Sequence, residues 1–309
     1  MQNQKIKVLY IAGFERSGST ILNRLLGQID GFVTVGEIKF IWQDGLIKDN
    51  PCACGALFKE CGYWQNILNQ AFGGIEKIDY HKIARLQQET RTLFIKSLGN
   101  LTESSLKDSA GEYITSLEKL YQAIQSCTGA KVIVDSSKLI WYGSTLTKLD
   151  NIDLYVVHLV RESYAVCYSL QQHKAKNEPL SQWYNPVHGA LSWTLKNSAV
   201  EMFLKRSPER YMRINYEDFI QNPKTGLQAL LNFLQEEEAN INFIEDNQAK
   251  LSVNHIFGGS PSSTTKKGLV DLRLDDRWKK GMKPIDKAIV SSLTWPLLRK
   301  YGYFQSSKV

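Results

Sequence analysis

The sequence of 309 residues contains no long uncharged run of apolar residues. The apolar run Val8–Ala12 follows a basic N-terminal patch but spans only a few residues. A transmembrane helix needs about 20 apolar residues, and the apolar core of a signal peptide needs at least about 7. We therefore expect neither a signal peptide nor a membrane span, and we predict a soluble, cytoplasmic protein.

The sequence also lacks any block of five or more like charges, any signature of RNA or DNA binding, and any internal repeat. Lys and Arg number 38 against 31 Asp and Glu, which gives a net charge of +7. A moderate positive charge favours an anionic ligand without requiring a nucleic acid. The composition is that of an ordinary globular protein, and the length suits one large α/β domain or two small ones.

Cysteine is scarce, but three of the five cysteines crowd together at Cys52, Cys54 and Cys61. This spacing could supply three ligands to zinc, yet no fourth Cys or His follows at a usual distance. The nearest histidine along the chain is His81. We favour a reduced, partly buried structural loop; zinc and a disulfide remain alternatives. No cluster of carboxylates is placed to hold a metal, so we predict no metal for catalysis.

The pattern strand, small polar turn, helix occupies the first thirty residues. The run Val8–Ala12 is apolar and β-prone, Gly13–Ser19 is small and polar, and Thr20–Gly27 places apolar residues at helical spacing. This layout directs free backbone N–H groups and the positive end of a helix toward an anion. We predict a phosphate-binding loop, with a plain tight turn as the alternative.

The loop lacks the lysine that a nucleotide triphosphatase would use. Gly13-x-x-x-x-Gly18-Ser19-Thr20 matches the phosphate loop G-x-x-x-x-G-K-[ST] except that Ser19 replaces lysine, and a cation lies inside the loop at Arg16. The loop should therefore hold a phosphate, but not as a usual magnesium–nucleotide complex. A P-loop kinase or nucleotide triphosphatase with a degenerate loop remains an alternative.

Further strands are expected to end in polar or charged residues. Gly31–Gly36 leads to Glu37, Lys131–Asp135 leads to Ser136, Ser137 and Lys138, and Leu154–Val160 leads to Arg161. Open α/β sheets bind ligands at this edge. Alternatively, Glu37 balances a helix dipole and the two serines begin a helix. If a helix starts after Arg161, Ser169 lies about two turns on and can face the same ligand.

Other segments predict secondary structure but contain few candidate functional residues. Asp79–Ser126 has apolar residues at helical spacing, Ile38–Ile47 suits a short helix, and Pro223–Leu234 suits another. Tyr211–Phe219 reads as a strand followed by a helix. Asn254–Gly268 is rich in Gly, Ser and Thr and is predicted to be a loop.

The segment Gly13–Thr20 resembles the 5′-phosphosulfate loop of sulfotransferases that use 3′-phosphoadenosine 5′-phosphosulfate (PAPS). Its Arg-Ser-Gly-Ser form is similar to that of the bacterial and tyrosylprotein branches. The resemblance implies a P-loop-like α/β fold, a three-layer sandwich with a central, mainly parallel sheet and helices on both faces. It implies a single domain over 1–309 with a helical insertion around 65–128.

The resemblance also implies roles for individual residues. The loop residues Gly13, Arg16, Ser17, Gly18, Ser19 and Thr20 would hold the phosphosulfate. Glu37, in a Gly-Glu pair similar to that of the tyrosylprotein branch, would be the general base, and Lys138 would face the sulfuryl group together with Arg16. Arg161 and Ser169 resemble the 3′-phosphate site, Lys266-Lys267-Gly268 the element that closes over it, and Tyr216 a neighbour of the adenine.

The implied activity is transfer of a sulfuryl group from PAPS to an acceptor hydroxyl, releasing adenosine 3′,5′-bisphosphate. The acceptor would be a carbohydrate, lipid, metabolite or peptide hydroxyl. Besides the degenerate kinase, a third possibility is a non-catalytic protein that binds adenosine 3′,5′-bisphosphate. That alternative would gain support if Glu37 lay outside the donor cleft.

Overall fold

The computed structural model describes residues 5–97, 103–177, 185–205, 208–259, 264–265 and 267–303. Its centre is a five-stranded parallel sheet in the order β2-β3-β1-β4-β5. The strands are β1 (Ile6–Gly13), β2 (Phe32–Gly36), β3 (Val132–Lys138), β4 (Ile152–Val160) and β5 (Tyr211–Asn215). All five strands predicted from apolar runs are present.

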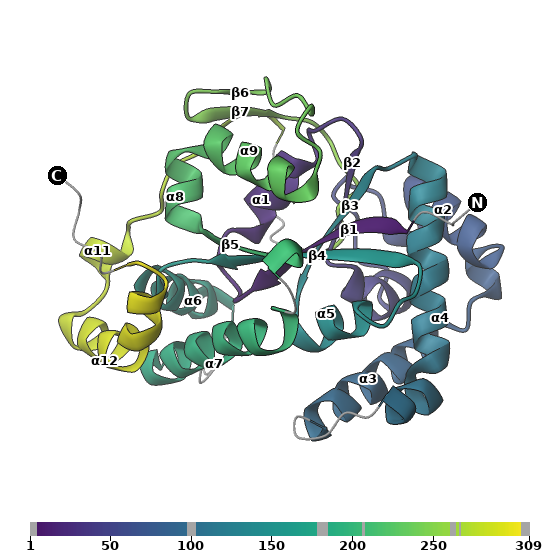
Figure 1. The fold of residues 1–309 in the computed structure, drawn as a ribbon, viewed down its shortest axis with the longest axis horizontal. Coiled ribbons are helices and arrows are strands. Elements are labelled where there is room, and N and C mark those ends of the chain that lie inside the picture. The colour runs from purple at the N-terminus through teal and green to yellow at the C-terminus, as the bar shows by residue number, and fades with distance from the viewer. Residues whose placement is uncertain are drawn as a thin grey trace.

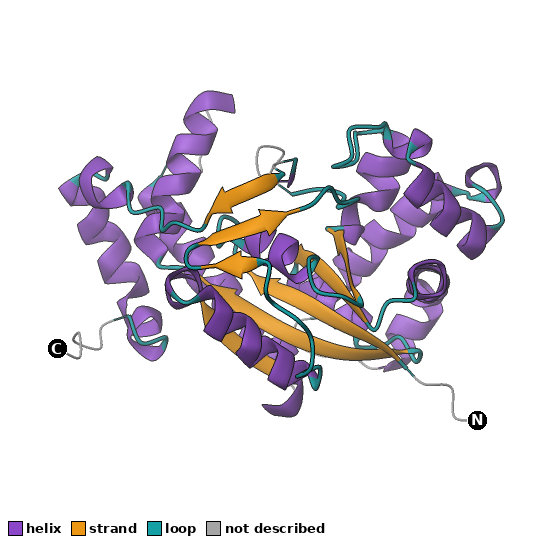
Figure 2. Ribbon diagram, turned by 90° about the horizontal axis from the view of Figure 1, so that it is seen from above, coloured by secondary structure: helices purple, strands orange, loops and turns teal. Residues whose placement is uncertain are grey.

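Helices cover both faces of this sheet, which confirms the predicted three-layer arrangement (Figure 1). One face packs against α1 (Ser19–Leu26), α8 (Tyr216–Gln221) and α9 (Pro223–Leu234). The opposite face packs against α5 (Ile140–Leu146) and α7 (Pro186–Leu204). Figure 2 shows the strands side by side, with helices at both flanks.

Alternation along the central strand explains the two cores. In β1, Leu9 and Ile11 point into the α1–α9 core, whereas Val8 and Tyr10 point into the α5–α7 core, and all four are fully buried. A strand buried on both faces reads as a continuous apolar run, because neither side meets water. This is why the short run near the N-terminus identified the central strand.

The remaining helices form two groups. The predicted helical segment contains α2 (Gly62–Phe72), α3 (Tyr80–Lys96) and α4 (Glu103–Thr128), and α4 packs on the same face of the sheet as α5 and α7 (Figure 1). In the second group, α6 (Ser163–Asn177) packs with α11 (Trp278–Gly281) and α12 (Pro284–Lys300). Among the described helices, none combines the length and apolar character needed to cross a membrane.

The helix expected over Ile38–Ile47 is irregular. A 3₁₀ turn, η1 (Ile38–Phe40), leads into a π-helical turn, η2 (Ile41–Ile47). Its buried residues are Ile41, Trp42, Gly45 and Leu46, a spacing of one, four and five that suits the wider π turn. Further 3₁₀ turns in the described part of the chain are η3 (Phe58–Glu60), η4 (Ile75–Lys77) and η6 (Pro208–Arg210).

Two local features differ from the sequence expectations. Ser136 to Lys138 continue β3 instead of starting a helix, because α5 begins only at Ile140. A small antiparallel sheet, absent from the predictions, is formed by β6 (Ile244–Glu245), β7 (Gln248–Leu251) and β8 (Gly268–Asp271). Each of these strands spans four residues or fewer, too short to give a clear alternating pattern.

Candidate active site

A cavity of about 550 Å³ lies at the carboxyl ends of the central strands. In the order β3-β1-β4, the strand order changes direction next to β1. Open α/β sheets form their ligand crevice at such a topological switch point. Residues from the ends of β1, β3 and β4 meet there. The lining consists of Glu15, Arg16, Gly18, Ser19, Thr20, Ile21, Glu37, Lys39, Phe40, Lys138, Arg161, Ser169, Tyr216, Gly259, Asp275 and Arg277.

The predicted phosphate loop connects β1 to α1 and forms one wall of this cavity. Gly18 precedes the helix in a left-handed conformation, with φ of 90°. A Cβ atom at Gly18 would lie 2.3 Å from the ring of Tyr216, so the position accepts only glycine. Among the described residues, no side chain caps α1 and no acidic residue lies in its first turn. Its leading N–H groups and positive dipole end therefore suit an anion.

Glu37 and Lys138 come together although they are 101 residues apart. The Lys138 Nζ atom donates to Glu37 Oε1 at 2.5 Å, and Lys39 Nζ lies 3.4 Å from Glu37 Oε2. All three side chains are at most 12% exposed. The carboxylate thus lies between two ammonium groups at the rim of the phosphate-binding wall.

The turn that carries Lys138 is held by a buried carboxylate beneath it. The Ser137 backbone N–H donates to Asp135 Oδ1 at 2.7 Å, and Tyr121 Oη donates to Asp135 Oδ2 at 2.5 Å. Ser137 Oγ in turn accepts from the Lys39 N–H at 3.2 Å. Burial raises the pKa of Asp135 to about 6. One internal network therefore positions both lysines around Glu37.

Arg16, Arg161 and Ser169 also meet in the cavity. The Arg16 Nε atom donates to Ser169 Oγ at 3.0 Å, and Arg161 Nη1 donates to the Arg16 carbonyl at 3.0 Å. The Arg161 guanidinium lies 4.9 Å from the centre of the Tyr216 ring. Burial, and then the charge of Arg161, lower the pKa of the Arg16 guanidinium. An anion between these two cations would relieve both effects.

An acidic side chain borders the two guanidinium groups. Asp275 lies 3.6 Å from Arg161 Nη2 and accepts two hydrogen bonds from Arg277, at 2.6 and 2.8 Å. These hydrogen bonds lower the pKa of Asp275 to about 2, against the effect of its partial burial. Among the described lining residues, five cations face three carboxylates. The cavity is therefore suited to a ligand with several negative charges.

The structure places the other predicted site residues as follows. Ser19, Thr20 and Tyr216 line the cavity, whereas Gly13 and Ser17 lie buried behind it. Lys266 lies outside the described residues. Lys267 and Gly268 are exposed at the start of β8, and neither lines the cavity. Of the predicted closing element, the two described residues thus lie outside the cavity wall, and its role over the 3′-phosphate stays a prediction.

Several lining residues were missed by the sequence reasoning. Lys39 follows Glu37 by two residues, and a short irregular helix brings it back to the same carboxylate. Asp275 and Arg277 follow β8 and gave no motif, because Asp275 joins Arg277 to the site through Arg161, which lies more than a hundred residues earlier. Glu15 lies within the predicted phosphate loop but was given no role; it pairs with Lys196 at 2.8 Å.

Comparisons with known proteins bear on the fold and the family of this chain. A search of curated protein sequences found no significant match. Among solved structures, the sulfotransferase domain of the curacin biosynthetic pathway is 18% identical, with a TM-score of 0.55, covering 94% of this chain and 97% of that one. Its likeness supports the same fold.

Two further structures are more distant. The sulfotransferase domain of the Synechococcus PCC 7002 olefin synthase is 18% identical, with a TM-score of 0.48 and coverage of 95% and 96%. A sulfotransferase of Mycobacterium tuberculosis H37Rv is 11% identical, with a TM-score of 0.46 and coverage of 94% and 78%. The model of the sulfotransferase family matches residues 9–239, which is most of the chain. The protein therefore belongs to the sulfotransferase family.

Proposed function

We propose that the protein transfers a sulfuryl group from PAPS to an acceptor hydroxyl, with Glu37 as the general base. The observation that carries this proposal is the convergence of the Arg16 loop, the Arg161–Ser169 pair and the Glu37–Lys138 pair on one cavity. A donor with phosphate groups at both ends needs cations at two places. The cavity offers both, and a carboxylate lies beside them.

The chain's residues divide the chemical step between them. Arg16 and the N–H groups at the start of α1 bind the phosphosulfate, and Arg161 with Ser169 binds the 3′-phosphate. Glu37 accepts the acceptor's proton as the oxygen–sulfur bond forms and the bond from sulfur to the 5′-phosphate oxygen breaks. Lys138, Lys39 and Arg16 stabilise the charge on the sulfuryl oxygens and on the departing adenosine 3′,5′-bisphosphate.

Two alternatives make different predictions. A degenerate P-loop kinase would bind ATP with Mg²⁺, but Ser19 occupies the position of the required lysine. A non-catalytic binding protein has no need of a base, yet Glu37 lines the same cavity as the phosphate loop. We propose a carbohydrate, lipid, metabolite or peptide hydroxyl as acceptor, and a cytoplasmic location.

The proposal is tested by thermal-shift titration with adenosine 3′,5′-bisphosphate, with ATP plus Mg²⁺ in parallel. A ligand that binds only the folded state stabilises it by about 2.7 kcal/mol at a hundredfold excess over Kd. We expect stabilisation by the bisphosphate alone. A response to ATP with Mg²⁺ and none to the bisphosphate would refute the proposal.

Two variants of Arg161 sharpen this test. Arg161→Ala should weaken bisphosphate binding roughly 10- to 150-fold, since a hydrogen bond to a charged group contributes about 1.5–3 kcal/mol. Arg161→Lys keeps the charge but loses the planar fork, so its affinity should fall in between. Arg210→Ala is the control: Arg210 also forms an ion pair, with Asp153, but does not line the cavity. Equal affinity for all three would contradict the assignment of Arg161.

A further inference from the structure

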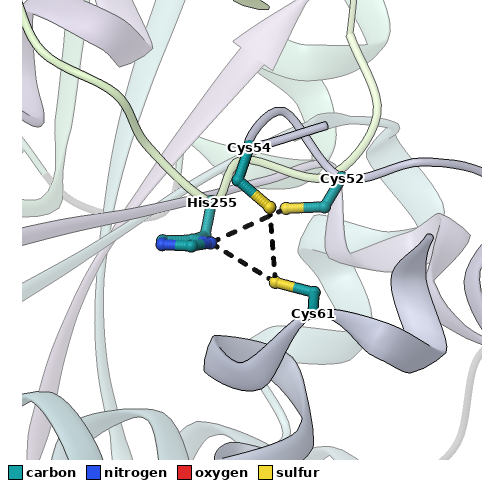
Figure 3. Close-up of side chains that lie close together, drawn as sticks. All are labelled: Cys52, Cys54, Cys61 and His255. Atoms are coloured by element: carbon teal, nitrogen blue, oxygen red, sulfur yellow. Dashed lines mark hydrogen bonds between the residues drawn. The ribbon is translucent and has the colours of Figure 1, made fainter. Parts of the chain in front are cut away.

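Three thiols and one imidazole from distant parts of the chain meet beside the active site. Cys52, Cys54 and Cys61 come from the loop between η2 and α2, and His255 comes from the segment after β7 (Figure 3). One potential ligand atom from each residue lies within 4.8 Å of all the others. No fourth ligand was expected at a usual spacing, because His255 follows Cys61 by 194 residues.

Three of the distances within this cluster are close to those of a tetrahedral zinc site. Zinc binds thiolate sulfur at about 2.3 Å and imidazole nitrogen at about 2.0–2.1 Å, so neighbouring ligand atoms are about 3.6–3.8 Å apart. The observed separations are 3.3 Å from Cys61 Sγ to His255 Nδ1, 3.9 Å from Cys52 Sγ to the same nitrogen, and 3.7 Å between Cys54 Sγ and Cys61 Sγ. A disulfide needs about 2.05 Å, and these cysteines are free.

We propose that Cys52, Cys54, Cys61 and His255 bind one structural zinc ion. Three soft thiolates and one imidazole in tetrahedral array form a ligand set that selects zinc, and four protein ligands leave no open position for catalysis. Cys52 and Cys61 are at most 3% exposed, so the site is closed to solvent on their side. The metal serves the fold, and the reaction proposed above needs none.

The surroundings hold the imidazole in a ligating orientation. The Tyr63 ring stacks on the His255 ring, with centres 4.7 Å apart and planes within 7°. The Trp64 indole N–H donates to the His255 carbonyl at 3.0 Å, and Trp64 is fully buried. Figure 3 shows a ring nitrogen of His255 directed at the sulfur atoms. This packing restrains the ring, so that Nδ1 stays close to the sulfur atoms of Cys52 and Cys61.

The proposed zinc ion ties the segment after β7 to the candidate base. Two residues beyond His255, the Phe257 carbonyl accepts the Glu37 N–H at 2.7 Å, and the Phe257 N–H donates to Val35 at 3.2 Å. A Cβ atom at Gly36 would lie 2.2 Å from the Phe257 oxygen, so the two segments touch directly. The same segment then reaches Gly259, which lines the cavity. Zinc would therefore position one wall of the active site.

Metal content of the tag-free full-length protein is the first test. Elemental analysis should find about one zinc per chain, as expected for a single four-ligand site. Cys61→Ser and His255→Ala should abolish the stoichiometric zinc. Cys127→Ser and His81→Ala are the matched controls, since neither residue belongs to the cluster, and both should retain it. Absence of zinc from the parent protein after growth in zinc-containing medium, with a disulfide among these cysteines, would overturn the proposal.

Two measurements on the unmutated chain test the zinc site even if the variants fail to fold. Reconstitution with Co²⁺ should give the thiolate charge-transfer and d–d absorption of tetrahedral cobalt. A strong chelator should lower Tm, and added zinc should restore it. An octahedral cobalt spectrum, or a Tm indifferent to chelator after complete removal of bound metal, would contradict a structural tetrahedral site.

The link from zinc to the active site rests on the proposed function and is tested separately. Removing zinc should weaken binding of adenosine 3′,5′-bisphosphate in a chelator titration, and zinc should restore it. Unchanged binding in the metal-free protein would refute the positioning role while the zinc site stands. A zinc-loaded protein that binds no bisphosphate would instead refute the proposed function.

Discussion

Replacing Glu37 with glutamine tests both the chemistry and the electrostatics of the candidate active site. The carboxylate lies between Lys138, at 2.5 Å, and Lys39, at 3.4 Å, and its side chain is 8% exposed. Glutamine keeps the shape but removes the negative charge. The two ammonium groups then face each other across a neutral amide in a largely buried site.

The stability cost follows from this burial. Removing one partner of a buried ion pair costs about 3–5 kcal/mol, because the remaining charge is left uncompensated. Lys138 and Lys39 retain slight solvent contact, so we expect the lower end of that range, about 3 kcal/mol. Combining Glu37→Gln with Lys138→Met removes one of the two uncompensated cations, and should recover part of the lost stability.

The catalytic cost is separate from the stability cost. A positioned general base contributes about 10²–10⁴ to the rate, so Glu37→Gln should lower turnover by that factor. The double variant should be no more active than the single one, because repairing the electrostatics does not restore a base and Lys138 is lost as well. Bisphosphate affinity should change far less than turnover, since Arg161 and the Arg16 loop remain in place.

The assay combines urea unfolding with turnover of a radiolabelled sulfuryl donor. The acceptor is whichever compound reacts fastest in a panel of phenols, sugars and hydroxyl-bearing peptides. Glu112→Gln is the control: Glu112 pairs with Lys82 at 2.7 Å, and both side chains are more than 40% exposed, so the pair contributes only about 0–1 kcal/mol. Full turnover by folded Glu37→Gln with unchanged bisphosphate binding would show that Glu37 is not the base. A stability loss no larger than the control's would refute the electrostatic argument.

Two further predictions concern the residues that shape the site. Burial raises the pKa of Asp135 from 3.8 to about 6. The protonated carboxyl therefore stabilises the fold fully below about pH 4, and about 3 kcal/mol of the free energy of unfolding is lost as the pH rises through 6. Asp135→Asn should therefore gain stability relative to the parent across this window in pH-dependent urea unfolding, and a constant difference between the two would contradict the raised pKa. Gly18→Ala should lose bisphosphate affinity and more stability than Gly302→Ala, because both glycines have φ of 90° but only Gly18 would clash, at 2.3 Å, with Tyr216. Equal losses of stability in the two alanine variants would show that the contact with Tyr216 is unimportant.

The parts of the site that the sequence predicted are those fixed by local chain geometry. Because the carboxyl ends of parallel strands share one edge, polar residues that follow apolar runs must gather there. That rule alone brings Arg16, Lys138 and Arg161 to one cavity. It required only that the strands be recognised, and strands buried on both faces are the ones whose apolar runs are continuous.

The parts that it missed depend on long-range packing. Lys39 joins Glu37 because an irregular helix turns it back, and that irregularity reflects how Trp42 and Leu46 are buried. The closing element Lys266-Lys267-Gly268 was carried over from a resemblance. Gly268 begins β8 of a short antiparallel sheet that no alternating pattern indicated, Lys267 directly precedes this strand, and Lys266 lies outside the described residues. Neither outcome follows from residues within a few turns of the site.

The cysteine cluster also depends on long-range packing, and it connects the cysteine loop with the candidate active site. A spacing rule searches for the fourth ligand near the third, whereas the fold brings His255 back along the edge of β2. The segment that supplies the histidine is also the segment that accepts the Glu37 N–H. Because a ligand and a contact to the candidate base lie two residues apart, anything that anchors the first restrains the second. The placement of Glu37 therefore depends on the loop that contains His255 and Phe257, and the sequence around Glu37 alone does not predict this contact.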